Sequence, residues 1–217
     1  MLRFVSLGAD CQTAAQLSVF AGTQPPQFFD KIAVPIRSVI QLIENNFADL
    51  MLSENLHPIY SGETLACVVD TLHRIDFGHD FNAFDTDEIM AVRKRYQLCV
   101  RWFAELLQPD ARPVYFVRRW HPRDGSDDEL NALRLYEVLR AKRADVRLLY
   151  LHKDQTRQDV VVGGYRSTFL HFPENCHWKG NTPAWQDILR NFACRPLGAE
   201  DHAAFPLRGQ FPVFVRN

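Results

Sequence analysis

The sequence predicts an α/β fold, a single three-layer α/β/α domain with helices on both faces of a mostly parallel sheet. Apolar runs typical of strands alternate with segments of helical periodicity along the 217 residues. The clearest unit is a strand, a helix and a strand at residues 113–151, which implies a parallel pair joined by a right-handed crossover. Because no repeat or low-complexity linker interrupts the alternation, we expect one domain, residues 1–217.

In the first half of the chain, a strand at residues 4–7 leads into a helix at 11–21, with Asp10 as its N-cap and Gly22 at its end. Pro35 opens an amphipathic helix. Its apolar positions are spaced to bury one face: Ile36, Val39, Ile40, Ile43, Phe47 and Leu50. Residues 52–64 are expected to be irregular because Pro58 and Gly62 act as breakers, and 65–77 fit either a strand or a helix.

In the second half, residues 85–88 and 126–129 resemble capping boxes, and each predicts a helix start. The continuous apolar run at 114–117 is typical of a strand buried on both faces, and 146–151 is the next strand. Further strands are expected at 160–162 and 167–172, a last helix from 182, and a terminal strand at 211–215.

Composition excludes several classes of protein. The net charge of −1 argues against a nucleic-acid-binding protein, and no apolar run reaches the roughly 18 residues that span a bilayer. The N-terminus shows no signal-peptide pattern, and five cysteines without a CxxC motif indicate free thiols in a reducing, cytoplasmic setting. The loose cluster His171, Cys176 and His177 matches no common zinc module, so we expect neither metal nor cofactor.

Cys11 is the candidate nucleophile. It lies in the first turn of a predicted helix, where unpaired backbone N–H groups and the helix dipole favour the thiolate. The alternative is a small buried residue that packs this helix on the sheet. His79 is the candidate base, and Asp80 or Asn82 offers an oxygen that can orient its ring. The alternative for His79 is a loop cap, and for Asp80 a turn residue.

Two further polar clusters follow predicted strands, at residues 118–121 and 152–153. Since ligands of parallel sheets bind at the carboxyl ends of the strands, we expect these clusters to converge with Cys11. Arg118 and Arg119 suit a carboxylate or a phosphate, or pair with a nearby aspartate. The candidate ligand-binding residues are Asp10, Asp30, Arg118, Arg119 and His121.

The motif Ser6-Leu7-Gly8-Ala9-Asp10-Cys11, followed by Ala15-Gln16-Leu17, is similar to the opening of a bacterial family, domain of unknown function 1796, described as papain-like cysteine peptidases. Phe29-Asp30 and Phe77-Gly78-His79-Asp80-Phe81 extend the resemblance, which covers residues 3–120. Lys31 departs from it, because an aromatic residue, often Trp, is expected there.

The resemblance implies that Cys11 is the nucleophile and His79 the base, with Asp80 or Asn82 as a third residue. It also implies a papain-like α+β fold with an antiparallel sheet or barrel, as an alternative to the parallel sheet. We therefore expect a cysteine-dependent hydrolase that acts on a peptide, amide or ester bond of a peptide or small-molecule substrate. The alternatives are a non-catalytic or transferase-type domain that binds a phosphorylated or anionic ligand through Arg118 and Arg119, and an interaction domain. The oligomeric state is not indicated.

Overall fold

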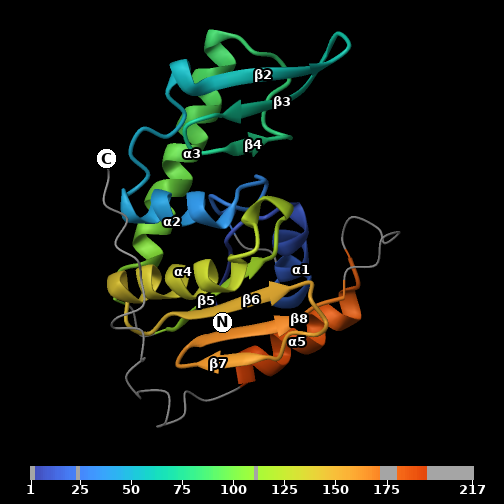
Figure 1. Ribbon diagram of the computed structural model, residues 1–217. Coiled ribbons are helices and arrows are strands. Elements are labelled where there is room, and N and C mark those ends of the chain that lie inside the picture. The colour runs from blue at the N-terminus through green and yellow to red at the C-terminus, as the bar shows by residue number, and fades with distance from the viewer. Residues whose placement is uncertain (1–2, 23–24, 110–111, 172–179, 195–217) are drawn as a thin grey trace, which may run out of the picture.

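A computed structural model describes residues 3–22, 25–109, 112–171 and 180–194. Its main sheet has five strands in the order β1-β5-β6-β8-β7 (Figure 1). The first four run parallel, and β7 pairs antiparallel with β8. The strands are β1 (Arg3–Ser6), β5 (Val114–Arg119), β6 (Arg147–His152), β7 (Val160–Val162) and β8 (Tyr165–Phe169). The prediction of a mostly parallel α/β sheet is therefore confirmed, and an antiparallel main sheet is not the arrangement found.

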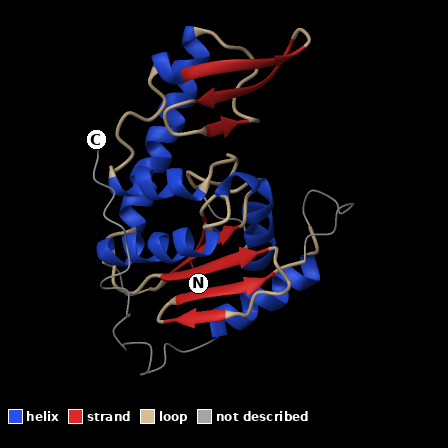
Figure 2. Cartoon of the chain, viewed as in Figure 1, coloured by secondary structure: helices blue, strands red, loops and turns tan. Residues whose placement is uncertain are grey.

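Helices cover both faces of this sheet (Figure 2). On one face, α1 (Cys11–Ala21) and α5 (Thr182–Cys194) contribute Leu17 and Trp185 to an apolar cluster with Phe4 and Leu149. On the other face, α2 (Ile36–Glu44) and α4 (Asp128–Lys142) pack on the side chains of alternate strand positions. The chain from β5 through α4 to β6 is the predicted crossover unit, and its two strands are parallel.

A smaller antiparallel sheet stands beyond α2 (Figure 1). Its strands are β2 (Leu56–Ser61), β3 (Thr64–Asp70) and β4 (Ile75–Phe77), and the long α3 (Thr86–Leu106) runs from it back to the main sheet. Phe77 of this sheet belongs to the same apolar cluster as Phe116 of the main sheet. The two sheets therefore share a continuous core.

The expectation of irregular structure over residues 52–64 is wrong, because β2 occupies 56–61 after a short 3-10 turn at Ser53–Asn55. Pro58 is tolerated because β2 is an edge strand, which leaves one row of N–H groups unpaired anyway. Gly62, at φ 62°, makes the hairpin turn to β3. The ambiguous segment 65–77 forms the remainder of this sheet.

The amphipathic helix α2 is shorter than its apolar spacing suggests. It ends at Glu44, and four of the next seven residues have positive φ, namely Asn46, Phe47, Asp49 and Met51. Phe47 is nevertheless packed against the rings of Phe28 and Phe103. Its burial thus fits the helical periodicity although its backbone is not helical.

The two capping motifs differ in outcome. Asp85 accepts a hydrogen bond from the Glu88 amide (2.8 Å) and caps α3 as predicted. At the start of α4 the predicted capping box does not form: Asp127 is the N-cap and makes no capping bond, and Glu129 turns toward the sheet and accepts a hydrogen bond from Ser167 (2.7 Å). The predicted terminal strand at 211–215 lies outside the described residues, and no helix within them is long and apolar enough to cross a membrane.

Candidate active site

A sharp turn joins β1 to α1. Gly8 (φ 77°) and Ala9 (φ 85°) both have positive φ, and Ala9 is fully buried. A Cβ atom on Gly8 would lie 2.7 Å from Val34 Cγ1, so only glycine fits there. Positive φ at an alanine is strained and is maintained by the surrounding packing. The turn places Cys11 in the first turn of α1, at the carboxyl end of the edge strand β1.

Asp10 is the N-cap of α1, as the sequence predicts. Its carboxylate accepts a hydrogen bond from the Gln12 amide (2.9 Å) and forms an ion pair with Arg119. Arg119 also donates to Gln12 Oε1 (3.0 Å), so the start of α1 is tied to the end of β5. The helix start and its N-terminal loop are thus held by side chains from the neighbouring strand.

Cys11 is partly buried and opens onto a cavity of about 300 Å³ between α1 and the segment 25–31. The cavity wall is largely apolar, and its titratable groups are Cys11, Asp30 and Lys31. Its lining residues are Phe4, Ser6, Cys11, Ala14, Ala15, Leu17, Ser18, Pro25, Pro26, Gln27, Asp30 and Lys31. A small group of a substrate can therefore lie against the thiol.

The surroundings raise the pKa of the Cys11 thiol. Burial has the largest effect, and the carboxylate of Asp10 adds to it. The backbone N–H of Cys11 acts in the opposite direction, as does Lys31, whereas Asp80 raises the pKa further. The expectation that the helix start favours the thiolate is therefore wrong for the resting protein, because burial and nearby acids outweigh the helix terminus.

Asp30 is a second perturbed group in this cavity. One of its oxygens accepts a hydrogen bond from the Gln27 amide (2.7 Å). Burial raises its pKa to about 6, although that hydrogen bond and the charge of Lys31 act in the opposite direction. Asp30 is thus a carboxyl group that changes its charge just below neutral pH.

His79 lies in the loop after β4 and is exposed. No hydrogen bond joins its ring to Cys11 or to any other of the described residues, but the next residue, Asp80, is close enough to affect the pKa of Cys11. Asp80 is held by Arg95 (3.1 Å) and by the hydroxyl of Tyr96 (2.8 Å) rather than by His79. The loop that carries His79 therefore lies near Cys11, but no hydrogen bond joins the imidazole to the thiol.

Asn82 has a local role in this loop. Its backbone N–H (2.9 Å) and its side-chain amide (3.1 Å) both donate to Glu88 in the first turn of α3. These bonds anchor the loop that carries His79 to the start of α3. In this structure Asn82 fixes the loop and does not orient the imidazole directly.

Arg118 is completely buried. It donates to the backbone oxygens of Leu7 and Val34 (each 2.9 Å) and pairs with Asp124 (2.9 Å). Asp124 in turn accepts from the Ile36 amide (2.7 Å) at the start of α2. Pairing with an aspartate is thus the correct alternative, and Arg118 has no exposed surface to offer a phosphate or a carboxylate.

His121 caps the short 3-10 turn at Pro122–Asp124. Its Nδ1 accepts a hydrogen bond from the Arg123 amide (3.1 Å). Burial, followed by the charge of Arg118, lowers its pKa to about 4. His121 is therefore neutral at physiological pH, and its Nδ1 is engaged in capping this turn.

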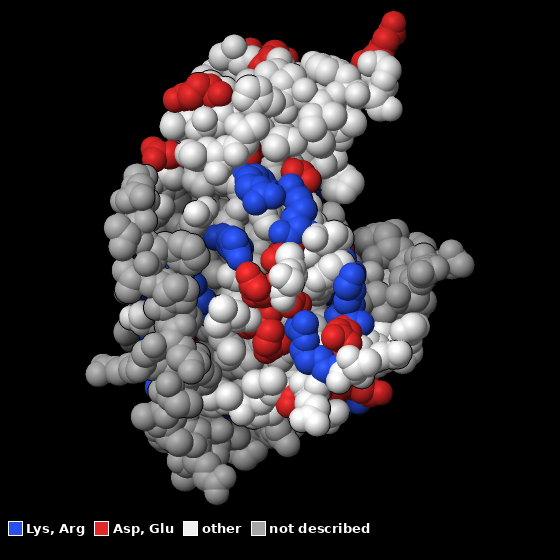
Figure 3. Space-filling model, viewed as in Figure 1, with Lys and Arg blue, Asp and Glu red and all other residues white. Residues whose placement is uncertain are grey.

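The predicted convergence of polar clusters with Cys11 is found only in part, because Cys11 lines one cavity and Arg119, Trp120 and Lys153 line another. Arg119 forms an ion pair with Asp10, the neighbour of Cys11. The ammonium group of Lys153 lies over the ring of Trp120, 3.7 Å from its centroid. A cavity of about 330 Å³ lies there, lined by Arg119, Trp120, Lys153, Gln155, Phe169 and His171. Figure 3 shows basic and acidic side chains interspersed on the face that it presents, between the two sheets.

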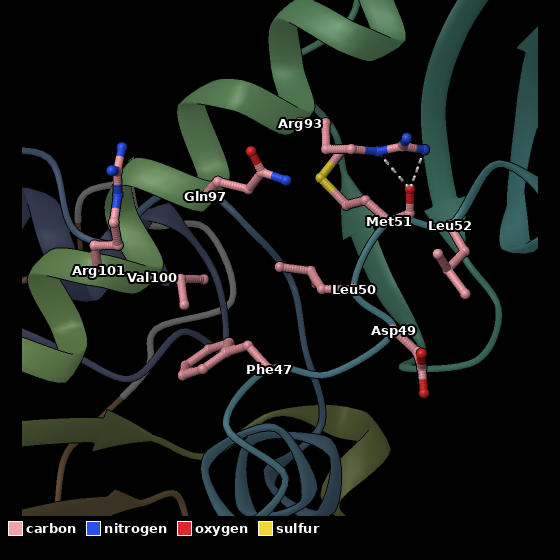
Figure 4. A pocket seen from close by; sticks show the side chains of 9 residues that line it. All are labelled: Phe47, Asp49, Leu50, Met51, Leu52, Arg93, Gln97, Val100 and Arg101. Atoms are coloured by element: carbon pink, nitrogen blue, oxygen red, sulfur yellow. Dashed lines mark hydrogen bonds between the residues drawn. The ribbon is translucent and has the colours of Figure 1, made fainter.

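Sequence analysis missed two features. The first is a polar network in which Asp128 and Glu129 of α4 accept hydrogen bonds from Tyr150 and Ser167 and pair with Arg157. The second is a cavity of about 550 Å³ between α3 and the loop after α2, where Arg93 donates to the carbonyl of Met51 (2.6 Å) (Figure 4). Neither has a sequence motif, because both join segments that are distant in the chain.

No cluster of three or more His, Cys, Asp or Glu side chains suited to a metal occurs among the described residues. Cys176 and His177 of the loose cluster considered above lie outside the described residues. Of the other cysteines, Cys99 on α3 is directed toward the carbonyl of Pro26 (3.8 Å), a residue that lines the Cys11 cavity.

The fold and the site define a class: an α/β protein with a thiol at the start of a helix that follows a parallel strand. Within that class, residues 2–155 match the model of the family domain of unknown function 1796, described as "Putative papain-like cysteine peptidase". The chain belongs to this family, and the match extends beyond residues 3–120, which contain the motifs that resemble it. No curated protein and no solved structure matches the chain significantly.

Proposed function

We propose that the chain is a cysteine-dependent hydrolase in which Cys11 is the nucleophile and His79 the proton acceptor. The bond cleaved is a peptide, amide or ester bond. One observation carries the proposal: Cys11 follows a strained strand-to-helix turn and opens onto a cavity of about 300 Å³. Such a turn presents the nucleophile of many α/β hydrolases, and strain at a functional site is common.

In the acylation step, His79 takes the proton of the Cys11 thiol while the sulfur attacks the carbonyl carbon. The carbonyl oxygen becomes an oxyanion, which backbone N–H groups at the start of α1 stabilise. The C–N or C–O bond then breaks, and the imidazolium returns its proton to the leaving group. Water hydrolyses the thioester with His79 again as the base, which restores the thiol and releases the acid.

Four features support these roles. The family match covers both Cys11 and His79. The His79 loop is anchored by Asp80 and Asn82, which bond to residues of α3 and thereby fix its position. The raised pKa of Cys11 means that the thiol needs a base, because few thiolates form without one. His79 is exposed, so its ring is free to turn toward a substrate bound at Cys11.

Alkylation by iodoacetamide at neutral pH tests the pairing. Tryptic peptide 4–31 contains Cys11 as its one cysteine, so mass spectrometry of this peptide reports the rate at Cys11 directly. We expect His79→Ala to slow the labelling of Cys11 at least about tenfold, since general-base assistance contributes on the order of a hundredfold or more.

His57→Ala is the matched control, because His57 is an exposed histidine on β2 of the smaller sheet. It should label at the wild-type rate. If His79→Ala and His57→Ala label equally fast, His79 is not the proton acceptor. If Cys11 does not react at all, it is not the nucleophile.

A further inference from the structure

Asp30 is a partly buried carboxylate that, unlike the fully buried ones among the described residues, has no ion-pair partner. Asp124 pairs with Arg118, Asp128 with Arg157, and Asp70 with His73. Asp30 forms no ion pair with any of the described residues, and its one hydrogen bond comes from the Gln27 amide. Because a carboxylate that is partly removed from water is stabilised by a counter-charge, Asp30 is harder to ionise without one.

The space beside Asp30 is the cavity onto which Cys11 opens. The groups that face Asp30 are the Gln27 amide, Lys31, and the thiols of Cys11 and Cys99. Lys31 is the one cation among them, and it is exposed and forms no ion pair with Asp30. The missing counter-charge can therefore come from a molecule that enters the cavity.

We propose that the cavity accepts a primary ammonium group of the substrate, with Asp30 as its counter-charge. The inference rests on the proposed function and narrows its substrates. They are amides or peptides that carry a free amine or a short basic side chain next to the cleaved bond. Asp30 is thus a specificity-determining residue.

The charges around Cys11 also favour a positively charged group in the cavity. Asp10 and Asp80 both act on the thiol as negative charges, against Lys31 alone as a positive one. An ammonium beside the thiol brings a positive charge near the sulfur, which lowers the pKa of Cys11. The cation that fits the cavity therefore also favours the thiolate when the substrate is bound.

Charged methanethiosulfonates test the proposal, because they differ mainly in the charge beside the reacting sulfur. The rates at Cys11 are measured by mass spectrometry of the tryptic peptide that contains it. The probes are the aminoethyl (ammonium), sulfonatoethyl (anionic) and methyl (neutral) reagents. Dividing each rate by that of the methyl reagent removes differences in thiolate content. We expect the wild type to favour the ammonium over the sulfonate, and Asp30→Asn to reduce that preference about tenfold.

Asp30→Asn keeps an oxygen that can accept from the Gln27 amide, and Glu63→Gln, at the exposed hairpin tip, is the control for a lost charge. The wild type alone gives a second readout. Its preference for the ammonium should grow as pH rises through about 6, where Asp30 ionises. Equal preferences in wild type and Asp30→Asn, a preference that does not change with pH, or no reaction with any reagent would each overturn the proposal.

Failure of the proposed function gives a different result. If His79 is not the proton acceptor, His79→Ala leaves the alkylation of Cys11 unchanged, whereas charge selectivity in the cavity persists. If Asp30 does not bind a cation, the selectivity is absent and the effect of His79→Ala remains.

Discussion

Two regions near the carboxyl ends of β1 and β5 differ in whether their titratable groups have ion-pair partners. Around Arg118, the guanidinium meets two carbonyl oxygens and Asp124, and the group is fully buried. Around Cys11, a thiol and a carboxyl group share a cavity, and no cation among the described residues forms an ion pair with either. The first arrangement joins β1, β5 and the start of α2, and it holds the fold. The second leaves its groups available, and each has a raised pKa.

The largest loss of stability is expected at Arg118. Arg118→Ala removes the partner of a buried carboxylate, so we expect a loss of about 3–5 kcal/mol in the free energy of unfolding. Urea unfolding measures it. Arg37→Ala is the control, because the Arg37–Asp127 pair is exposed and is worth about 0–1 kcal/mol. A loss below about 1 kcal/mol for Arg118→Ala would show that this region does not hold the fold.

At Asp30, unlike Arg118, removing the charge should stabilise the protein. Burial raises the pKa of Asp30 from 3.8 to about 6, so the protonated carboxyl favours the folded state. This stability is fully present below the unfolded pKa and is lost as pH rises to about 6. We expect Asp30→Asn to be more stable than the wild type by about 1–2 kcal/mol at neutral pH, after discounting for partial exposure. This advantage should shrink as the pH falls toward 4. An advantage independent of pH would contradict the account.

A smaller effect is expected in the turn before Cys11. Ala9→Gly relieves positive φ at a buried alanine, so we expect a gain of about 1 kcal/mol in the free energy of unfolding. Thermal unfolding measures it as a rise in Tm. The reverse substitution at the neighbouring position, Gly8→Ala, should destabilise the protein, because its Cβ would meet Val34. A loss of stability in Ala9→Gly would show that the turn is not strained.

Much of the fold could be predicted because its signals are local. Asp10 and Asp85 cap the helices that follow them, and the apolar run from Val114 to Val117 becomes a buried parallel strand. Strand β2 of the smaller sheet could not be predicted, because Pro58 and Gly62 are typical of breakers. Their effect depends on whether the strand is central or at an edge, which is a property of the sheet.

The candidate site could be predicted only in part. The position of Cys11 at a helix start follows from local sequence, but its pKa depends on burial and on acids that the fold brings near. The role of Arg118 depends on the carbonyl oxygens of Leu7 and Val34, which precede it by 111 and 84 residues. Such contacts have no spacing pattern that a single sequence can show.

The central claim is that Cys11 accepts an acyl group with the help of His79. Acetylation by para-nitrophenyl acetate at neutral pH, followed by mass spectrometry of peptide 4–31, tests it most directly. We predict an acetyl group on Cys11 that forms rapidly and is then released by water, with both steps slowed in His79→Ala. Acetylation that is no faster at Cys11 than at the other cysteines, or that does not depend on His79, would contradict the account.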